Sequence, residues 1–299
     1  MILAQPLRPY PMRHPDFPPA VAAPSGWQAT LSLRFAERGG RTALVERRHK
    51  GPLLVQKPLY PEGDICHAVV LHPPAGIAGG DQLEIDIAVE PGAHAVLATP
   101  GATKWYKSLG REASQQVRMT VAAGARLDWL PQENIMFDDA RARIATFVDV
   151  APGASAIGWD TVVLGRLASG EQWSRGELWL DTQVRIDGRP RWIEQSHLEA
   201  ASPLRHAAAG LDGLNILGTL WAVGEGATQA LAESLAAALP YSPDLRAGVT
   251  CLPGPQPMLL LRVLGHRMES VRRVLVDAWT ALRAPVHGVP ARPLRLWST

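Results

Sequence analysis

A weak internal repeat decides the fold: Val89-Glu90-Pro91-Gly92-Ala93, Val121-Ala122-Ala123-Gly124-Ala125 and Val150-Ala151-Pro152-Gly153-Ala154. Its glycines lie 32 and then 29 residues apart. Each copy is typical of a strand, a tight turn and a second strand, because glycine readily adopts the positive φ that such turns require. A period near 30 residues made of β elements predicts that equivalent turns stack in space. Solenoid-like sheets have this arrangement, and in them each unit buries its face against the next.

Strict alternation of apolar and polar residues surrounds the repeat. It is found in residues 30–35, 83–89 and 183–187, and Gly188 follows the last of these as in a hairpin turn. Alternation with a period of two residues is typical of strands that are buried on one face. The sequence therefore predicts a mainly β protein of stacked, solenoid-like β-sheets.

Helical periodicity is confined to the last quarter of the chain. Residues 227–239 and 268–283 carry apolar side chains at helical spacing, and between them lies the apolar run 258–261, which is typical of a buried strand. In the second segment Arg272, Arg273 and Asp277 are expected to face away from the core. The sequence thus predicts two α-helices near the C terminus. The apolar positions are Leu231, Leu235 and Leu239 in the first helix and Val271, Leu275, Trp279 and Leu282 in the second.

Composition agrees with this fold class. The chain has 299 residues, 46% of them apolar and 19% charged, which is the range of globular proteins. Its 27 glycines and 26 prolines disfavour a helical bundle, because both residues interrupt helices. Residues 1–25 are proline-rich without an apolar segment, so we interpret them as a flexible arm rather than a secretion signal. Residues 26–299 are expected to form a single domain.

The charge and cysteine content argue against several classes of protein. A net charge of +2 gives no reason to expect a nucleic-acid partner, which favours a concentrated basic face. The two cysteines, Cys66 and Cys251, form no CxxC pair, which argues against a disulfide framework and a zinc ribbon and favours a cytoplasmic location. No apolar run approaches 18 residues, so we expect no membrane-spanning segment.

The usual enzyme motifs are missing. The phosphate-binding pattern GxxxxGK[ST], the nucleophile elbow GxSxG and the zinc motif HExxH do not occur. Residues 72–81 form a loop of prolines and glycines that serves either as a tight turn or as a close approach to a ligand. Cys66 and His67 are adjacent, and neighbouring strand residues face opposite sides, so they are only a weak candidate metal site.

Four acidic residues have the parity of core residues in their strands. An ionised carboxylate turned toward a core costs several kcal/mol unless it meets a cation, a partner or water. Each acid would therefore pair with an arginine, lie at a strand end, or line a polar interior passage. Carboxylates along a passage would hold a divalent cation weakly at each position. Two of them could instead serve as the acid and base of a sugar-cleaving β-solenoid. The four are Asp81, Glu133, Asp160 and Glu194.

Taken as a set, five motifs resemble the UreD (UreH) family of urease accessory proteins. They occur in the family's order and span nearly the whole chain. The proline-rich arm is a departure, since it is longer than the family needs. The motifs are Gly26-Trp27-Gln28-Ala29-Thr30-Leu31, His72-Pro73-Pro74-Ala75-Gly76-Ile77-Ala78-Gly79-Gly80-Asp81, Thr99-Pro100-Gly101-Ala102-Thr103-Lys104-Trp105-Tyr106, Leu130-Pro131-Gln132-Glu133-Asn134-Ile135 and Trp159-Asp160 with Leu164-Gly165-Arg166.

This resemblance implies a non-catalytic maturation chaperone. Proteins of the family bind urease apoprotein and, with UreF and the GTPase UreG, enable nickel insertion into urease. Nickel would be a transient cargo passed through the interior rather than a permanent cofactor. The resemblance makes the four acids, Asp81, Glu133, Asp160 and Glu194, candidate nickel contacts, with Cys66 and His67 less favoured. Residues 229–299 are expected to contribute to the surface that meets UreF. A β-solenoid carbohydrate-active enzyme that uses a carboxylate pair remains the alternative.

Overall fold

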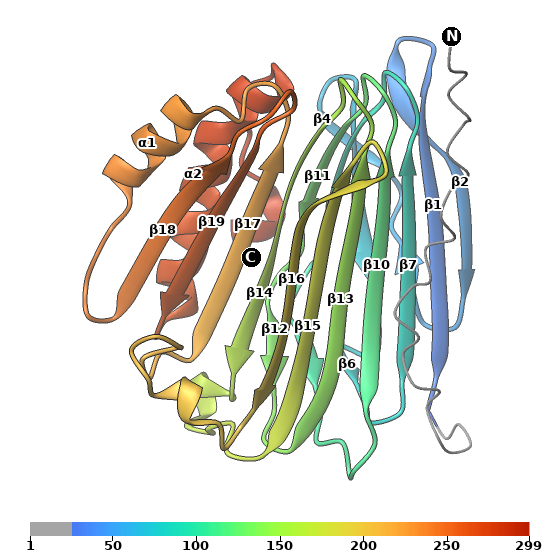
Figure 1. Ribbon diagram of the computed structural model, residues 1–299. Helices are drawn as coiled ribbons and strands as arrows, with labels where there is room; N and C mark the ends of the chain where they lie inside the picture. Colours follow the sequence, from blue (N-terminus) through green and yellow to red (C-terminus); the bar gives the residue numbers. More distant parts are fainter. Residues whose placement is uncertain (1–25, 299) are drawn as a thin grey trace, which may run out of the picture.

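The computed structural model describes residues 26–298 and consists of two stacked β-sheets with two helices against one of them (Figure 1). The predicted arm, residues 1–25, lies outside the described residues. Within the described part of the chain no helix has both the length and the apolar character needed to cross a membrane.

The first sheet has seven strands in the order β16-β15-β13-β10-β7-β1-β2. The five from β1 to β15 run parallel to one another, and antiparallel β2 and β16 form its edges. The strands are β1 Gln28–Arg38, β2 Arg41–Lys50, β7 Gln82–Val89, β10 Ala113–Val121, β13 Ala140–Val150, β15 Gly176–Ile186 and β16 Arg189–Glu199.

The second sheet is built around four parallel strands, β5, β8, β11 and β14, and is extended by antiparallel β17, β19 and β18. Five shorter strands complete it: β3 and β4 pair with β5, and β12, β9 and β6 form a row in which β12 pairs with β14. The bounds are β3 Leu54–Val55, β4 Leu59–Glu62, β5 Ile65–Leu71, β6 Gly76–Ile77, β8 His94–Ala98, β9 Thr103–Trp105, β11 Arg126–Leu130, β12 Asn134–Met136, β14 Ser155–Leu164, β17 Ile216–Val223, β18 Leu245–Leu252 and β19 Met258–Gly265.

The sequence repeat marks the turns that connect the two sheets. Val89, Val121 and Val150 lie side by side in the first sheet, each at the end of its strand. The backbone N–H groups of Ala122 and Ala151 each donate to the carbonyl of the valine one layer below, at 2.9 Å. The repeat glycines Gly92, Gly124 and Gly153 have φ of 77°, 71° and 72°. The predicted stacking of these turns is thus confirmed, and with it the solenoid-like fold.

The solenoid ends where the next turn becomes a hairpin. The Asp187 N–H donates to the Val150 carbonyl at 3.1 Å, so this turn still stacks on the previous layer. Asp187 and Gly188 both have positive φ, and the chain returns antiparallel as β16. Residues of this kind favour two-residue hairpin turns. The predicted hairpin at Gly188 is therefore confirmed.

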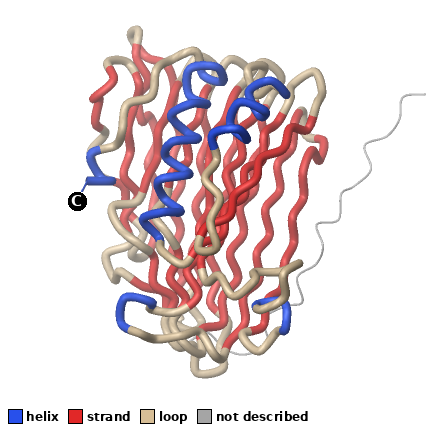
Figure 2. Tube along the Cα trace, turned by 90° about the vertical axis from the view of Figure 1, so that its left-hand side faces the viewer, coloured by secondary structure: helices blue, strands red, loops and turns tan. Residues whose placement is uncertain are grey.

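Both predicted helices are present, α1 over Gln229–Ala238 and α2 over Met268–His287. Figure 2 shows them side by side on the outer face of the second sheet. The Thr228 hydroxyl accepts the Leu231 N–H at the start of α1, and Gly288 ends α2 in a left-handed conformation. The predicted apolar face of α2 is buried against the sheet.

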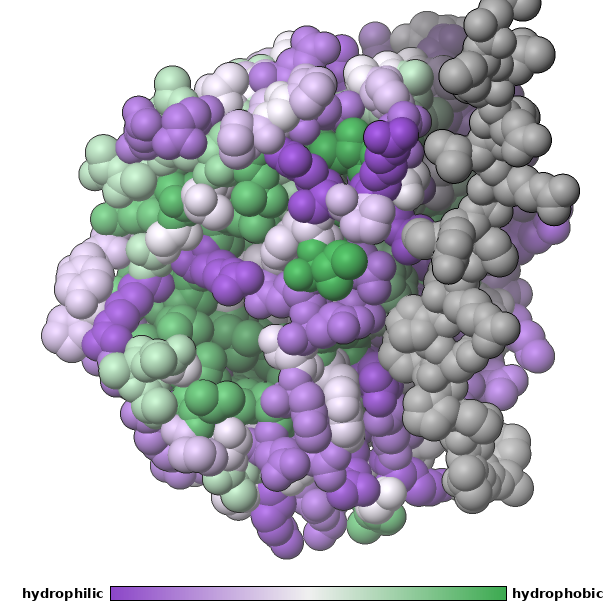
Figure 3. Space-filling view, in the orientation of Figure 1, coloured by the Kyte–Doolittle hydropathy of each residue, from purple (hydrophilic) through white to green (hydrophobic). Residues whose placement is uncertain are grey.

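Two hydrophobic cores meet at the second sheet, one between the two sheets and one between the second sheet and the helices. Within β14, Val162 and Leu164 point between the sheets, whereas Trp159 and Val163 point toward the helices. The outer face of the first sheet is mostly hydrophilic, and hydrophobic surface gathers where β17 to β19 extend beyond the first sheet (Figure 3). Parity along a strand of the second sheet therefore decides whether a side chain faces the solenoid interior or the helices.

Candidate functional site

A cavity of about 130 Å³ lies between the sheets, beside the turns that follow β5, β8 and β11. Its polar lining includes Asp160 of β14, His72 after β5, Gln115 of β10 and Asn134 of β12. No lysine or arginine lines it within the described part of the chain. A cavity with one carboxyl group and no basic side chain suits a cation rather than an anion.

Asp160 is the predicted acid that reaches this cavity. Its even position in β14 directs it between the sheets, as the sequence parity predicts. Burial raises the pKa of Asp160 to about 7, and a hydrogen bond with Thr146 opposes the rise only in part. The carboxyl group therefore changes charge near neutral pH, and an arriving cation would displace its proton easily.

His72 is a cavity residue that the sequence analysis did not select. Its Nε2 is buried without a hydrogen-bond partner among the described residues. Burial lowers the pKa of His72, and the charge of Asp81 opposes this. A neutral imidazole with an unpartnered nitrogen is a possible metal ligand. The rigid loop 72–81 was recognised in the sequence, but the histidine that opens it was not.

Asp81 lies at the start of β7 and is already hydrogen-bonded. Its two carboxylate oxygens accept the backbone N–H groups of Trp27 and Ala78, both at 2.8 Å. It thereby joins the loop 72–81 to the chain that enters β1. Gly26 packs tightly there, since a Cβ at this position would lie 2.1 Å from the carbonyl of Gly80. These contacts give Asp81 a structural role at a strand end.

Glu133 lies on the helix side of the second sheet. Its carboxylate accepts a hydrogen bond from Arg272 of α2 at 2.6 Å, so Arg272 does not simply face away, as the helix pattern predicted. A much smaller cavity adjoins this pair. Pro131 and Gln132 line both this cavity and the larger one, so the segment between β11 and β12 separates the two.

Glu194 lies on the edge strand β16. It forms an ion pair of 2.9 Å with Arg262 of β19. Because β16 belongs to the first sheet and β19 to the second, this pair bridges the two sheets where the solenoid ends. The four predicted acids thus occupy four different environments, and among them only Asp160 lines the larger cavity.

Cys66 and His67 face opposite sides of β5, as expected. Cys66 is buried in the core between the sheets, and this burial raises the pKa of its thiol. His67 faces the helices, where its Nε2 lies 2.8 Å from Glu62 Oε1. The two side chains therefore do not form one site.

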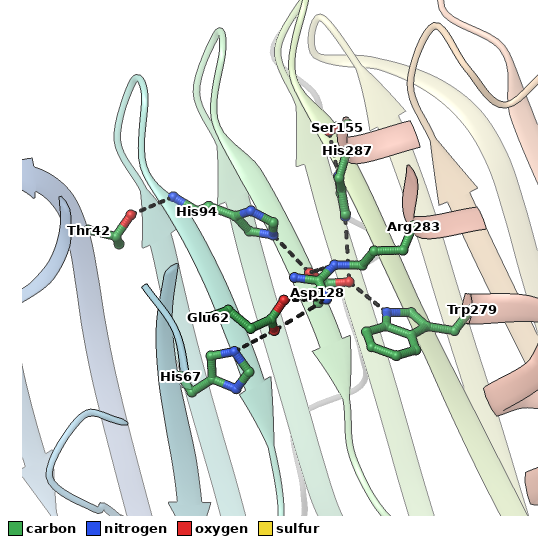
Figure 4. Close-up of polar contacts among 9 residues, drawn as sticks. All are labelled: Thr42, Glu62, His67, His94, Asp128, Ser155, Trp279, Arg283 and His287. Atoms are coloured by element: carbon green, nitrogen blue, oxygen red, sulfur yellow. Dashed lines mark hydrogen bonds and ion pairs between the residues drawn. The ribbon is translucent and has the colours of Figure 1, made fainter. Parts of the chain in front are cut away.

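A buried polar network lies between the second sheet and α2, centred on Asp128 of β11 (Figure 4). Trp279 Nε1 donates to Asp128 Oδ1 at 2.7 Å, and His94 Nε2 lies 2.9 Å from Oδ2. Arg283 Nε lies 3.3 Å from Oδ2, and His287 Nε2 lies 3.6 Å from Oδ1. Asp128 is thus enclosed by one side chain from β8 and three from α2.

Electrostatics in this network favour ionised acids. Burial works against the ionisation of Asp128, but the surrounding histidines and Arg283 hold its pKa well below the usual range. Burial also works against Glu62, whose pKa His67 and Arg283 together hold below its usual value. Burial lowers the pKa of His94 to about 4, so this ring is neutral at pH 7.

This network was not predicted from the sequence. One pattern could have revealed it: Trp279, Arg283 and His287 are spaced four residues apart and so share a face of α2. Polar residues on the buried face of a helix require buried partners. The partners, Asp128 and His94, have the parity of the helix-facing residues of their strands.

Comparisons with known proteins identify the family. The family model for the UreD urease accessory protein matches residues 28–298. The urease accessory protein UreD of Cupriavidus necator is 77% identical over 289 residues, which cover 96% of this chain and 100% of the relative.

More distant relatives carry the same name. The urease accessory protein UreD of Ralstonia nicotianae is 59% identical, covering 96% of this chain and 100% of its own length. That of Bordetella pertussis is 48% identical, covering 91% of this chain and 98% of its own length. These matches are to a non-catalytic maturation factor, as predicted, and not to a sugar-cleaving enzyme. The chain belongs to the UreD family of urease accessory proteins.

Proposed function

We propose that this protein binds urease apoprotein and, together with UreF and UreG, passes nickel toward the urease active site in the cytoplasm. Nickel is a transient cargo of this chain. Hydrolysis of GTP belongs to UreG, in keeping with the missing phosphate-binding motif. Residues 229–299, with α1 and α2, contribute to the surface that meets UreF.

The observation that carries the nickel proposal is the cavity between the sheets. A single carboxyl group and a single neutral imidazole offer too few ligands for a permanent nickel site, which normally uses more protein ligands. Weak ligation is what transit requires, because an ion held by a full ligand set leaves slowly. Because the pKa of Asp160 is about 7, a proton competes with the nickel ion for this carboxyl group at neutral pH.

The other predicted nickel contacts rank below Asp160 in this proposal. Glu133 would take part only if Arg272 released it, and it would then lie one short segment away from the cavity of Asp160. Asp81 and Glu194 would have to give up structural partners. Cys66 and His67 rank last, since one is enclosed in the core and the other is paired with Glu62.

The experiment compares urease from cells that carry the urease subunits and the other accessory proteins, with and without this chain. Nickel content and activity are measured on the same preparation. Omission should give inactive, nickel-poor urease, and expression of the chain should restore both. Fully loaded urease without the chain, even under limiting nickel, would contradict the proposal.

A further inference from the structure

Three side chains of the network beneath α2 converge in the manner of metal ligands. They are His94 of β8, Asp128 of β11 and His287 in the last turn of α2, all of them buried. One ligand atom from each lies within 4.8 Å of the other two. Figure 4 shows both imidazoles pointing toward the Asp128 carboxylate. Two imidazole nitrogens and one carboxylate oxygen are ligands that borderline dications such as Zn²⁺ and Co²⁺ prefer.

The charges of the network are not balanced by its own side chains. Asp128 and Glu62 share one guanidinium, that of Arg283, which lies 3.3 Å from each carboxylate. Two enclosed carboxylates thus face a single permanent positive charge. An uncompensated buried charge costs several kcal/mol. Either a proton on a histidine or a bound cation must compensate it.

His287 Nε2 lies farther from the Asp128 carboxylate than a hydrogen bond allows, whereas His94 Nε2 lies at hydrogen-bond distance, 2.9 Å. An imidazolium donating to a carboxylate would lie about 2.7–2.9 Å from it. His287 Nε2 instead lies 3.6 Å from Asp128 Oδ1 and has no hydrogen-bond partner among the described residues. In a tetrahedral site with bonds of about 2.0–2.1 Å, neighbouring ligand atoms are about 3.3 Å apart. The observed separation is close to that value.

The neighbours of His287 prepare its Nε2 for ligation. Ser155 Oγ lies 2.7 Å from His287 Nδ1, and when this nitrogen carries the ring proton and the hydroxyl accepts it, the Nε2 lone pair is free to bind a metal. Trp279 fixes the Asp128 carboxylate through its hydrogen bond to Oδ1. Such outer contacts orient the ligands of metal sites.

We propose that His94, Asp128 and His287 form a structural site for one transition-metal dication, which joins the last turn of α2 to strands β8 and β11. The positive charge of Arg283 would repel a cation at this site. Arg283 Nη1 already contacts Glu62, and pairing with Glu62 compensates the charge of the guanidinium. A small non-protein ligand such as water would complete a tetrahedron.

This site differs from the nickel passage and does not depend on it. Asp128 and Trp129 are neighbours in β11, but Asp128 faces the helices whereas Trp129 lines the cavity of Asp160. The sheet therefore separates the two places. An ion enclosed at Asp128 stays with the folded protein, whereas one at Asp160 is free to leave.

The test uses full-length protein stripped of metal and titrated with Co²⁺, whose visible absorption reports its coordination geometry. Wild-type protein should bind one Co²⁺ with a tetrahedral spectrum, and X-ray absorption of the Zn²⁺ form should show two imidazoles. The midpoint of thermal unfolding should rise with Zn²⁺. His287→Gln should weaken Co²⁺ binding by about tenfold or more, whereas Asp86→Asn, at the exposed pair with Arg118, should leave it unchanged.

Three outcomes would overturn the proposal. The first is a wild-type protein that binds no tetrahedral Co²⁺. The second is a Co²⁺ spectrum that survives unchanged in His287→Gln. The third is unfolding that responds to pH and not to Zn²⁺, which assigns the missing positive charge to a proton. Since the first and third use wild-type protein, a variant that fails to fold does not remove the test.

Discussion

The two sides of the second sheet shift the pKa of a buried acid in opposite directions. On the inner side, Asp160 lines a cavity without a cationic partner, and its pKa rises to about 7. On the helix side, Asp128 is completely enclosed, yet four neighbours hold it ionised. Asp160 can bind and release a proton or a metal ion easily, which suits the transit of an ion. Asp128 is part of the folded structure, and removing one of its partners should destabilise the folded protein.

The largest effect is expected from breaking the enclosed side. Arg283→Met leaves Asp128 and Glu62 without their shared cation and should lower the free energy of unfolding by about 3–5 kcal/mol. Urea unfolding followed by circular dichroism measures this. The matched control is Arg262→Met, at the exposed pair with Glu194, where the loss should be below about 1 kcal/mol. Equal losses in the two variants would contradict the claim that enclosure makes the Asp128 network part of the folded structure.

The next effect concerns the cavity side and has the opposite sign. Asp160→Asn removes a group whose pKa is higher in the folded chain than in the unfolded one. Ionising Asp160 destabilises the folded wild type as pH rises from about 4 to 7, by up to about 4 kcal/mol. The variant should therefore be more stable than wild type at pH 8, and this advantage should shrink toward pH 4.

Thermal unfolding across this pH range is the measurement. The exposed acid Asp86, paired with Arg118 at 3.6 Å, provides the control variant Asp86→Asn. Its difference from wild type should stay within about 0.5 kcal/mol at every pH. A pH-independent effect of Asp160→Asn would mean that Asp160 is ionised throughout, as Asp128 is.

A smaller loss of stability is expected from changing the glycine turns that connect the two sheets. Gly124→Ala places a side chain at a φ of 71° and should cost about 1 kcal/mol through backbone strain alone, since nothing lies within 4 Å of the added carbon. Gly248→Ala is equally uncrowded but without a positive φ, so it should be nearly neutral. If Gly124→Ala were as mild as Gly248→Ala, the left-handed turns would not be required for the stacking.

The fold could be predicted because its determinants are local. The repeat Val-x-x-Gly-Ala places a left-handed glycine at each turn, and alternation fixes which side of a strand is buried. The helical spacing of apolar residues in 268–283 likewise identified α2. Sequence parity also placed Asp160 correctly, because β14 is regular from Ser155 to Leu164.

The site could be predicted only in part. The parity of a residue in a strand tells which face of the sheet its side chain lies on, but not which residues it contacts there. Parity lapses after Pro131, so Glu133 turns toward α2 rather than the interior. Asp81 lies before its strand begins and accepts backbone hydrogen bonds instead. His94, Asp128 and His287 come from segments 34 and then 159 residues apart, and only the folded chain brings them together.

The most direct measurement of the central claim is the nickel content of urease matured with the Asp160→Asn variant under limiting nickel. Pull-down of urease and UreF in the same preparation checks that the complex still assembles. We expect an assembled complex whose urease holds several-fold less nickel, with partial recovery in Asp160→Glu, which restores the carboxylate. Full nickel loading by Asp160→Asn would contradict the claim that nickel passes the Asp160 carboxyl group between the two sheets.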